Sequence, residues 1–224
     1  MILPFVRHRA IDEQQKQDRR QAILTAALTL FQAATYEAVS MAAVAEGAGV
    51  AKGTLYLYFK TKEALFLALQ AEAFTAWFAR IDTFLRATSE PLATQTVVAF
   101  MVDSLAQQKA FLRLIAILHT TLEHNIDFAT ALAFKQMLRT HILQTGALLE
   151  ARLSFLYPGN GAQLLLRLYA LVIGLQHLSD PAPMVQQTLA EPGLDLFKVD
   201  FYSELSATLG ALVQGFALQS LGEG

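Results

Sequence analysis

Glycine and proline are almost missing from the middle of this 224-residue chain, and this restricts the folds open to it more than any other feature. No glycine occurs between Gly53 and Gly146, and Pro91 is the only proline between Pro4 and Pro158. Tight turns between strands depend on these two residues, whereas helix interiors exclude them. Leucine, alanine and glutamine dominate, and β-branched runs are scarce. The sequence therefore predicts an all-α fold.

The apolar periodicity and the turn residues predict about nine helices. We expect them at residues 12–34, 41–46, 52–58, 62–87, 92–107, 110–123, 126–155, 161–178 and 199–221. Residues 179–198 contain three prolines and a glycine and are expected to form a loop.

The composition excludes several classes of protein. Hydrophobic residues make up 54% of the chain and charged residues 16%, which is the opposite of a disordered protein and favours a deep interior, a large subunit interface, or both. The absence of cysteine excludes disulfides, cysteine-ligated metals and a thiol nucleophile. No apolar run approaches a membrane span and no signal peptide is recognisable, so we expect a soluble, cytoplasmic protein with no membrane partner.

The small net charge of −2 hides an asymmetry between the two ends of the chain. Residues 1–62 carry eight basic and five acidic side chains, whereas the rest of the chain carries nine basic and fourteen acidic ones. A basic end on an acidic body is typical of a protein whose one end meets a polyanion. Arg7, His8 and Arg9 form a basic arm that either contacts DNA or is a solvated tail.

Residues 40–66 have the pattern of a helix-turn-helix. Ser40 is a suitable N-cap for the first short helix, and glycines flank the turn at residues 47–49. Val50 and Leu55 supply apolar contacts between the two short helices, whose small alanines allow a close crossing. Phe59 is expected in the core. The residues left for contacts with nucleic acid are Lys52, Gly53, Thr54, Tyr56, Tyr58, Lys60 and Lys62, where Gly53 permits close approach of a phosphate strand.

The run KGTLYLYFKTKEAL at residues 52–65 closely resembles the signature K-G-x-L-Y-x-Y-F-x-[ST]-K-E-x-L of the TetR/AcrR family of transcriptional regulators. The resemblance is strong over about residues 15–66, and Phe31 and Tyr36 match the end of the family's first helix. Ala51, Leu57 and Thr35 depart from the common pattern. At Leu57 the departure leaves two interpretations open, apolar packing or contact with a thymine methyl.

The resemblance implies an N-terminal three-helix DNA-binding domain, residues 1–62, and a larger helical domain for ligand binding and dimerisation, residues 63–224. It also implies a role for each matching residue. Ser40 and Met41 would meet a phosphate, Lys52, Gly53 and Thr54 would open the recognition helix into the major groove, Tyr56 and Tyr58 would reach phosphates and base edges, and Lys62 would hold a phosphate.

The remainder of the chain is more apolar than one small core needs. The resemblance implies that the last two long helices pair with those of a second copy in a homodimer. The predicted interface consists of Leu168, Leu171, Leu175, Leu205, Leu209, Leu212 and Phe216. The middle helices suggest a chamber for a small-molecule effector, with candidate ligand-binding residues Trp77, Phe100, Phe111, His119, Glu123, Phe134 and His177.

Other functions compete with this interpretation. His119 and Glu123 share a helical face and, together with His177, suggest a polar or metal site, although a hydrogen-bonded helix end is the favoured explanation and no metal is predicted. No P-loop, G-x-S-x-G or H-E-x-x-H motif occurs, so no enzyme activity and no cofactor are expected. The sequence thus predicts a ligand-released repressor that binds double-stranded DNA at a palindromic operator. The alternatives are a transcriptional activator, an architectural DNA-binding protein and a small-molecule carrier.

Overall fold

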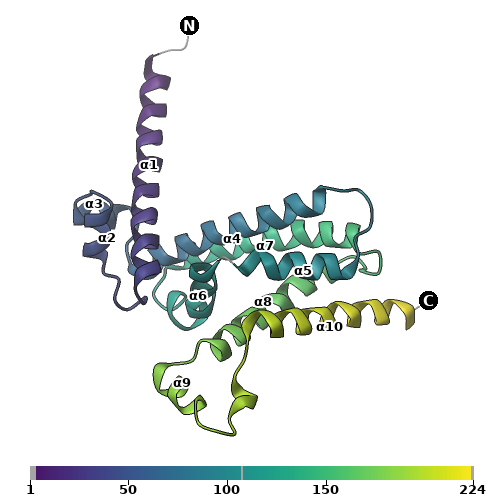
Figure 1. Ribbon diagram of the computed structural model, residues 1–224. Helices are drawn as coiled ribbons and strands as arrows, with labels where there is room; N and C mark the ends of the chain where they lie inside the picture. Colours follow the sequence, from purple (N-terminus) through teal and green to yellow (C-terminus); the bar gives the residue numbers. More distant parts are fainter. Residues whose placement is uncertain (1–3, 107, 223–224) are drawn as a thin grey trace. The chain divides into compact units, whose positions relative to one another are not determined.

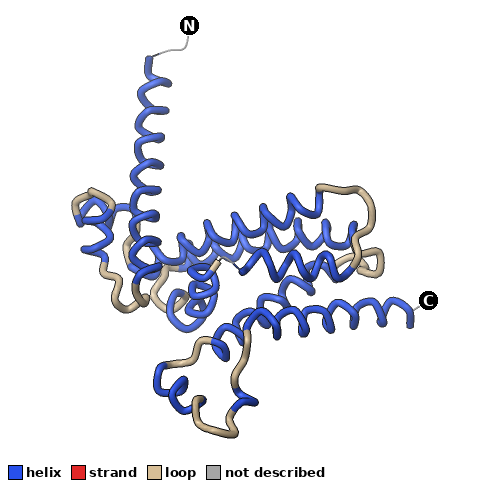
Figure 2. The backbone as a smooth tube through the Cα atoms, in the orientation of Figure 1, coloured by secondary structure: helices blue, strands red, loops and turns tan. Residues whose placement is uncertain are grey.

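A computed structural model describes residues 4–106 and 108–222, without the side chains of residues 4–12 and 221–222. These residues form α-helices and contain no strand (Figures 1 and 2). The α-helices are α1 (Pro4–Ala33), α2 (Met41–Gly47), α3 (Lys52–Tyr58), α4 (Lys62–Arg86), α5 (Thr94–Ala106), α6 (Lys109–Ile117), α7 (Phe128–Arg152), α8 (Asn160–Ser179), α9 (Pro183–Leu189) and α10 (Phe201–Gly222). The predicted all-α fold is confirmed.

Three elements differ from the expected ones. Helix α1 begins at Pro4 rather than near residue 12, so the backbone of the basic arm is helical, while the side chains of Arg7, His8 and Arg9 lie outside the described residues. Helix α6 ends in a π-helical turn, Leu118–Leu122, instead of continuing to residue 123. The expected loop contains α9, which begins with a proline at the first helical position, where the missing N–H has no intrahelical partner to lose.

The chain divides into two compact units. The first unit comprises Met1–Gln70 and His119–Ala131, and the second comprises Ala71–Leu118 and Leu132–Gly224. The division runs through α4 and cuts out the segment between α6 and α7, so the chain passes from one unit to the other three times.

The core of the first unit forms where α1 meets the short helices and the start of α4. Phe66 is fully buried, with the ring of Phe31 edge-on at 5.3 Å and that of Tyr36 at 4.9 Å between centroids. Thr61 caps the start of α4, because its hydroxyl accepts a hydrogen bond from the N–H of Ala64 at 3.0 Å.

In the second unit, α10 lies along α5 and α8 (Figure 1). Helices α4 and α7 are joined by a buried carboxylate. Asp82 accepts hydrogen bonds from the Thr145 hydroxyl at 2.5 Å and the Gln144 amide at 2.7 Å, and Arg86 lies 3.4 Å away. A buried carboxylate with three such partners is satisfied, so it positions the two helices without an unpaired charge.

Two glycines bring α7 and α8 into close contact. A Cβ added to Gly161 would lie 2.1 Å from the carbonyl oxygen of Gly146, and one added to Gly146 would lie 2.7 Å from the backbone nitrogen of Ala162. Only hydrogen fits at this crossing, so any larger residue must push the backbones apart. The crossing matters for the cavity described below, because α7 and α8 both line it.

Two helices, α4 and α8, are long and apolar enough to span a membrane by length and composition, each with a mean hydropathy of 1.2 over its most apolar 18 residues. This corrects the expectation that no segment qualifies, because leucine, alanine and phenylalanine outweigh the few polar residues in each helix. Core helices of water-soluble proteins pass the same test, and half of the α4 window is buried inside the protein. For α8 the buried share is 28%, so much of its apolar surface is not covered by the chain itself.

Candidate functional site

Helices α2 and α3 and the turn between them form the first candidate site. The hydroxyl of Ser40 accepts a hydrogen bond from the N–H of Ala43 at 3.1 Å, which confirms the predicted N-cap of α2. Gly49 has a φ of +65°, a left-handed conformation that favours glycine and turns the chain toward α3. Val44 and Leu55, both fully buried, anchor α2 and α3. This is the helix-turn-helix arrangement that the spacing predicted.

The two sides of α3 differ in exposure. Leu55 faces the core, whereas Lys52 and Gly53 are exposed, Tyr56 is 40% exposed and Leu57 is 86% exposed. Apolar packing within the chain therefore does not explain Leu57, and its contact with a thymine methyl stays a prediction. Thr54 and Tyr58 are half-buried, and Phe59 is buried as expected.

Gly53 has no heavy atom within 4 Å of the position that a Cβ would occupy. The fold therefore does not require glycine there, although glycine costs helix stability in the first turn. An external backbone that approaches this point would explain the residue.

The Lys62 ammonium is engaged within the protein. It donates a hydrogen bond to the Tyr36 carbonyl and another to the Glu37 carbonyl at 3.5 Å, and it lies 4.0 Å from the centre of the Tyr36 ring. Burial lowers the pKa of Lys62, while the Glu37 and Glu63 carboxylates act in the opposite direction. The Tyr36 hydroxyl donates to Glu63 at 3.1 Å, and burial followed by the charge of Glu63 raises the pKa of Tyr36. Lys62 thus stabilises the segment between α1 and α2, and its contact with a phosphate stays a prediction.

The segment from 119 to 131 belongs to the first unit. His119 Nδ1 lies 2.9 Å from a Glu123 oxygen, and the Thr61 hydroxyl donates to the Asn125 carbonyl at 3.1 Å. His177 lies on α8 in the second unit. Within residues 4–106 and 108–222 no three histidine, aspartate or glutamate side chains are grouped as a metal site would need. The His119–Glu123 pair is therefore a contact along one helical turn.

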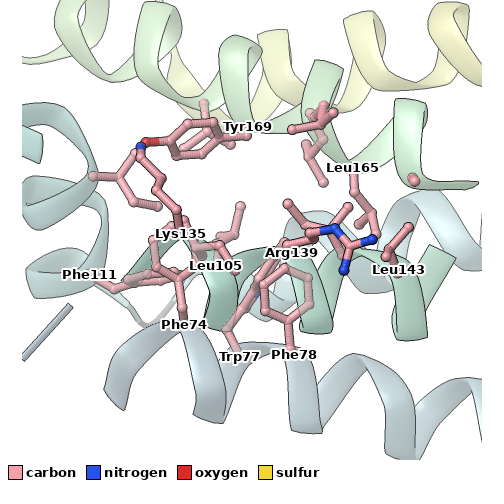
Figure 3. A pocket seen from close by; sticks show the side chains of 17 residues that line it. Phe74, Trp77, Phe78, Leu105, Phe111, Lys135, Arg139, Leu143, Leu165 and Tyr169 are labelled. Carbon is pink, nitrogen blue, oxygen red and sulfur yellow. The ribbon is translucent and has the colours of Figure 1, made fainter. Parts of the chain in front are cut away.

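The second candidate site is an apolar cavity of about 390 Å³ in the second unit (Figure 3). Residues from α4, α5, α6, α7 and α8 line it: Phe74, Trp77, Phe78, Leu105, Phe111, Ile115, Lys135, Leu138, Arg139, Ile142, Leu143, Ala162, Leu165, Leu166, Leu168, Tyr169 and Val172. Its size is within the range of small-molecule sites. The indole N–H of Trp77 donates to the Ser104 hydroxyl at 2.8 Å, which in turn donates to the Met101 carbonyl at 2.6 Å, so the indole is held in one orientation.

Two of the seven predicted ligand residues, Trp77 and Phe111, line this cavity. Phe134 is buried behind the lining, with its ring centre 6.3 Å from that of Phe74, and Phe100 stacks on Phe84 at 3.8 Å instead. His119, Glu123 and His177 are absent from the lining.

Comparisons with known proteins cover both units. The family described as "Bacterial regulatory proteins, tetR family" matches residues 23–69, and the family described as "Tetracyclin repressor-like, C-terminal domain" matches residues 71–219.

The chain belongs to the TetR family.

Curated relatives of this TetR-family chain match about a third of its length. The HTH-type transcriptional repressor KstR of Rhodococcus jostii is 47% identical over 68 residues, 30% of each chain. The HTH-type transcriptional regulator RutR of Escherichia coli K12 is 37% identical over 75 residues, 34% of this chain and 35% of RutR. The matched part spans about a third of the length of these relatives. They are transcriptional regulators, as are the matching families, and this confirms the expectation that the chain is not an enzyme.

Solved structures show the same fold over most of the chain. The regulator FadR of Bacillus subtilis, in complex with stearoyl-CoA, aligns with a TM-score of 0.52 and 17% identity over 86% of this chain and 96% of FadR. A TetR transcriptional regulator from Rhodococcus sp. RHA1 aligns with a TM-score of 0.53 and 18% identity over 89% and 97% of the two chains. At these identities the similarity concerns the fold alone.

The polar part of the cavity lining was not predicted from the sequence of this TetR-family protein. Lys135 and Arg139 lie one turn apart on α7, and Tyr169 lies on α8. The spacing of four residues between the two basic side chains was available as a signal. Nothing in the sequence, however, shows that α7 turns this side toward a cavity.

The predicted dimer interface falls into two groups. Leu168, Leu205, Leu209 and Phe216 are at most 4% exposed within the single chain, where α10 packs on α5 and α8. They have almost no surface to offer a partner, which corrects their assignment to an interface. Leu171, Leu175 and Leu212 are half-buried and stay in the prediction.

Proposed function

We propose that this TetR-family protein is a transcriptional repressor that binds a palindromic operator as a dimer and is released by a small apolar or amphipathic effector. The observation that carries the proposal is the combination of an outward-facing α3 on a helix-turn-helix with an apolar cavity in the second unit. KstR, whose name describes a repressor, supports the direction of regulation. FadR, seen with stearoyl-CoA, supports an effector with a long apolar part.

The proposed DNA-binding domain is residues 1–62, and residues 63–224 bind effector and partner. Lys52, Gly53, Thr54, Tyr56 and Tyr58 face DNA from α3, with Ser40 and Met41 at the start of α2 and Lys62 at the start of α4. Leu57 joins this face because an apolar side chain so exposed is suited to a thymine methyl. The first unit is larger than this domain, since it includes residues 63–70 and 119–131.

The proposed dimer forms through α8 and α10. Leu166 and Leu178 on α8 and Leu218 on α10 are each more than half exposed. Gly174 and Gly215 have open space around the position of a Cβ, which allows another helix to approach closely. Uncovered apolar side chains on two long helices favour burial against a second copy. We further propose that the protein acts in the cytoplasm.

Release by effector requires that the cavity and the DNA-binding face are coupled. Helix α4 begins with Lys62 in the first unit and carries Trp77 in the second. The segment 119–131 provides a further connection, because Ile115 of α6 and Lys135 of α7 line the cavity on either side of it in the sequence. An effector that favours a form with altered spacing of the two recognition helices weakens operator binding, since successive major grooves recur about every 34 Å. Coupling of about 1.4 kcal/mol is enough for a tenfold loss of affinity.

The proposal is tested by selecting duplexes from a random library and titrating the selected operator at several salt concentrations. Lys52→Ala is expected to weaken binding to every duplex and to lower the salt slope by about one. Thr54→Ala is expected to change the preference among operator bases. Lys198→Ala, in the second unit, serves as the matched charge control and should change neither. Unchanged titrations for Lys52→Ala and Thr54→Ala would show that α3 is not the DNA face.

Operator titrations with and without a cavity ligand distinguish a repressor from an architectural DNA-binding protein and from a small-molecule carrier. A repressor requires operator affinity that falls when a cavity ligand binds. Specific DNA binding that no cavity ligand changes indicates the architectural protein, and ligand binding without DNA binding indicates the carrier. Transcription from a promoter that contains the operator then separates repression from activation.

A further inference from the structure

The charged side chains in the cavity lining are all basic. Of the 17 lining side chains, two are cationic, one is a tyrosine and none is acidic. The remaining side chains are apolar, and the indole N–H of Trp77 is already bonded to Ser104. A neutral apolar compound would make no use of the Arg139 guanidinium.

The two cations lie on the same face of α7. Lys135 and Arg139 are four residues apart, so they are neighbours on the helix surface, and like charges at this spacing destabilise a helix. In Figure 3 the Lys135 side chain extends toward Tyr169, and the Arg139 guanidinium lies toward Leu143 and Leu165. An anion bound near this face would be attracted by both positive charges.

Arg139 has no interaction partner among the described residues. Throughout residues 4–106 and 108–222, no acidic side chain forms an ion pair with it, and no hydrogen bond or ring contact engages it. Its side chain is exposed at the cavity, next to walls made of leucine and isoleucine. A guanidinium presents a rigid fork of donors that fits a carboxylate or phosphate with two parallel hydrogen bonds.

The apolar part of the cavity determines the size of the ligand. A volume of about 390 Å³ accommodates about thirteen groups of the size of a water molecule. The aromatic wall of the cavity consists of Phe74, Trp77, Phe78 and Phe111. These side chains are buried and linked by ring contacts, and none of them carries a charge. An apolar chain or ring system of about ten to thirteen non-hydrogen atoms fits this volume, with its polar head group at the exposed Arg139.

We propose that the cavity takes an amphipathic anion, with its apolar body against the aromatic wall and its carboxylate or phosphate on Arg139, one helical turn from Lys135. This inference rests on the proposed effector role of the cavity and adds to it the charge of the ligand. It excludes neutral hydrocarbons, sterol-like alcohols and lipophilic cations as preferred ligands.

The ten-carbon series of decanoate, decyl phosphate, 1-decanol and decylammonium tests the charge preference at constant tail length. Trp77 is the only tryptophan of the chain and lines the cavity, so its fluorescence reports occupancy directly. We expect one or both anions to bind about tenfold or more tightly than decanol, and decylammonium to bind most weakly. The decanoate and decyl phosphate arms show whether the site selects carboxylate or phosphate.

The variant Arg139→Gln tests whether Arg139 is responsible for the preference for anions. The variant is expected to lower the affinity for the preferred anion about tenfold while decanol affinity stays within about twofold. Arg139→Lys, which retains the charge without the fork, should recover part of the loss, and Lys135→Gln should give a smaller loss. Arg80→Gln is the matched control, because it removes one exposed α4 cation that is absent from the cavity lining.

Equal affinities for decanoate, decyl phosphate and decanol, or no binding of either anion, would overturn the proposal. So would an anion preference that Arg139→Gln and Lys135→Gln leave unchanged. Operator titrations of the unliganded protein are run in parallel. If the protein binds its operator specifically but shows no anion preference, only the proposed ligand class is rejected. If it shows neither specific operator binding nor an anion preference, the proposed function is rejected as well.

Discussion

Aromatic and apolar side chains are arranged in opposite ways in the two units of this protein. On α3, Tyr56 and Leu57 face solvent, whereas Phe74, Trp77, Phe78 and Phe111 in the second unit are at most 8% exposed. Exposed apolar residues on a seven-residue helix are useful only if a large partner covers them. Buried aromatics around an open volume are useful to a partner small enough to enter it.

The cations of the two sites differ in whether they have partners within the protein. Lys62 is held by the carbonyls of Tyr36 and Glu37 and stabilises its own unit. Arg139 has no such partner among the described residues and is available to a ligand. A family motif identifies Lys62, but the environment of each cation shows which one is already engaged. Substitutions at each position test these contrasts.

The two leucines of α3 give the largest contrast between core and surface. Leu55→Asp places a carboxylate in the core of the first unit and is expected to cost about 4 kcal/mol or more, enough to unfold that unit. Leu57→Asp, at an exposed position, should change the free energy of unfolding by less than about 0.5 kcal/mol but repel the phosphate backbone. Urea titration and operator binding measure the two effects. A folded Leu57→Asp variant with normal operator affinity would remove Leu57 from the DNA face.

Two glycines of α8 test the packing behind the cavity. Gly161→Ala meets the α7 backbone and is expected to cost about 1–3 kcal/mol or more, because α7 and α8 must separate. Gly174→Ala has open space and should stabilise the isolated chain by up to about 1 kcal/mol. Thermal unfolding of both variants measures the difference, and sedimentation shows whether Gly174→Ala weakens the dimer. Equal stabilities would mean that the close crossing of the two helices is not rigid.

Gln70 is a polar residue in an otherwise apolar interior. It is fully buried on α4, and both polar atoms of its side chain lack hydrogen-bond partners within the described part of the chain. Gln70→Met, which keeps the length of the side chain, is therefore expected to raise the free energy of unfolding by about 1–2 kcal/mol. Chemical denaturation measures it. A loss of stability would instead indicate that buried water or another polar group satisfies the amide.

The two contrasted cations give the smallest expected difference. Lys62→Met removes hydrogen bonds to two carbonyls at a half-buried position and should cost about 1 kcal/mol. Arg139→Met removes an unpaired exposed charge and should stay within about 0.5 kcal/mol. The two unfolding curves are compared at the same ionic strength. A larger loss for Arg139→Met than for Lys62→Met would reverse the assignment of structural and ligand-binding roles.

Some features of the protein followed from short stretches of sequence. The two short helices, the Ser40 cap and the buried position of Phe59 were all predicted, because capping and helical periodicity act over a few residues. The extent of α1 and the presence of α9 were not, since low apolar periodicity in a polar helix and a proline at a first helical position leave weak signals.

Burial beyond one helix was harder to predict. The apolar stripe of α10 was interpreted as an interface, yet Leu205 and Leu209 pack inside their own chain. Periodicity shows that one side of a helix needs cover, but both a neighbouring helix and a second copy meet that need. Only the position of α10 along α5 and α8 distinguishes them.

The helical class, the helix-turn-helix and the family of this protein could be predicted from the sequence alone, because they depend on residue types along the chain and not on which helices pack together. Only the packing of the helices shows which aromatics line a cavity, which leucines remain exposed, and that Lys135 and Arg139 line that cavity. These properties arise where five helices, separated by up to a hundred residues of chain, pack together. Close packing assigns each side chain its neighbours, and no local pattern records which neighbours those are.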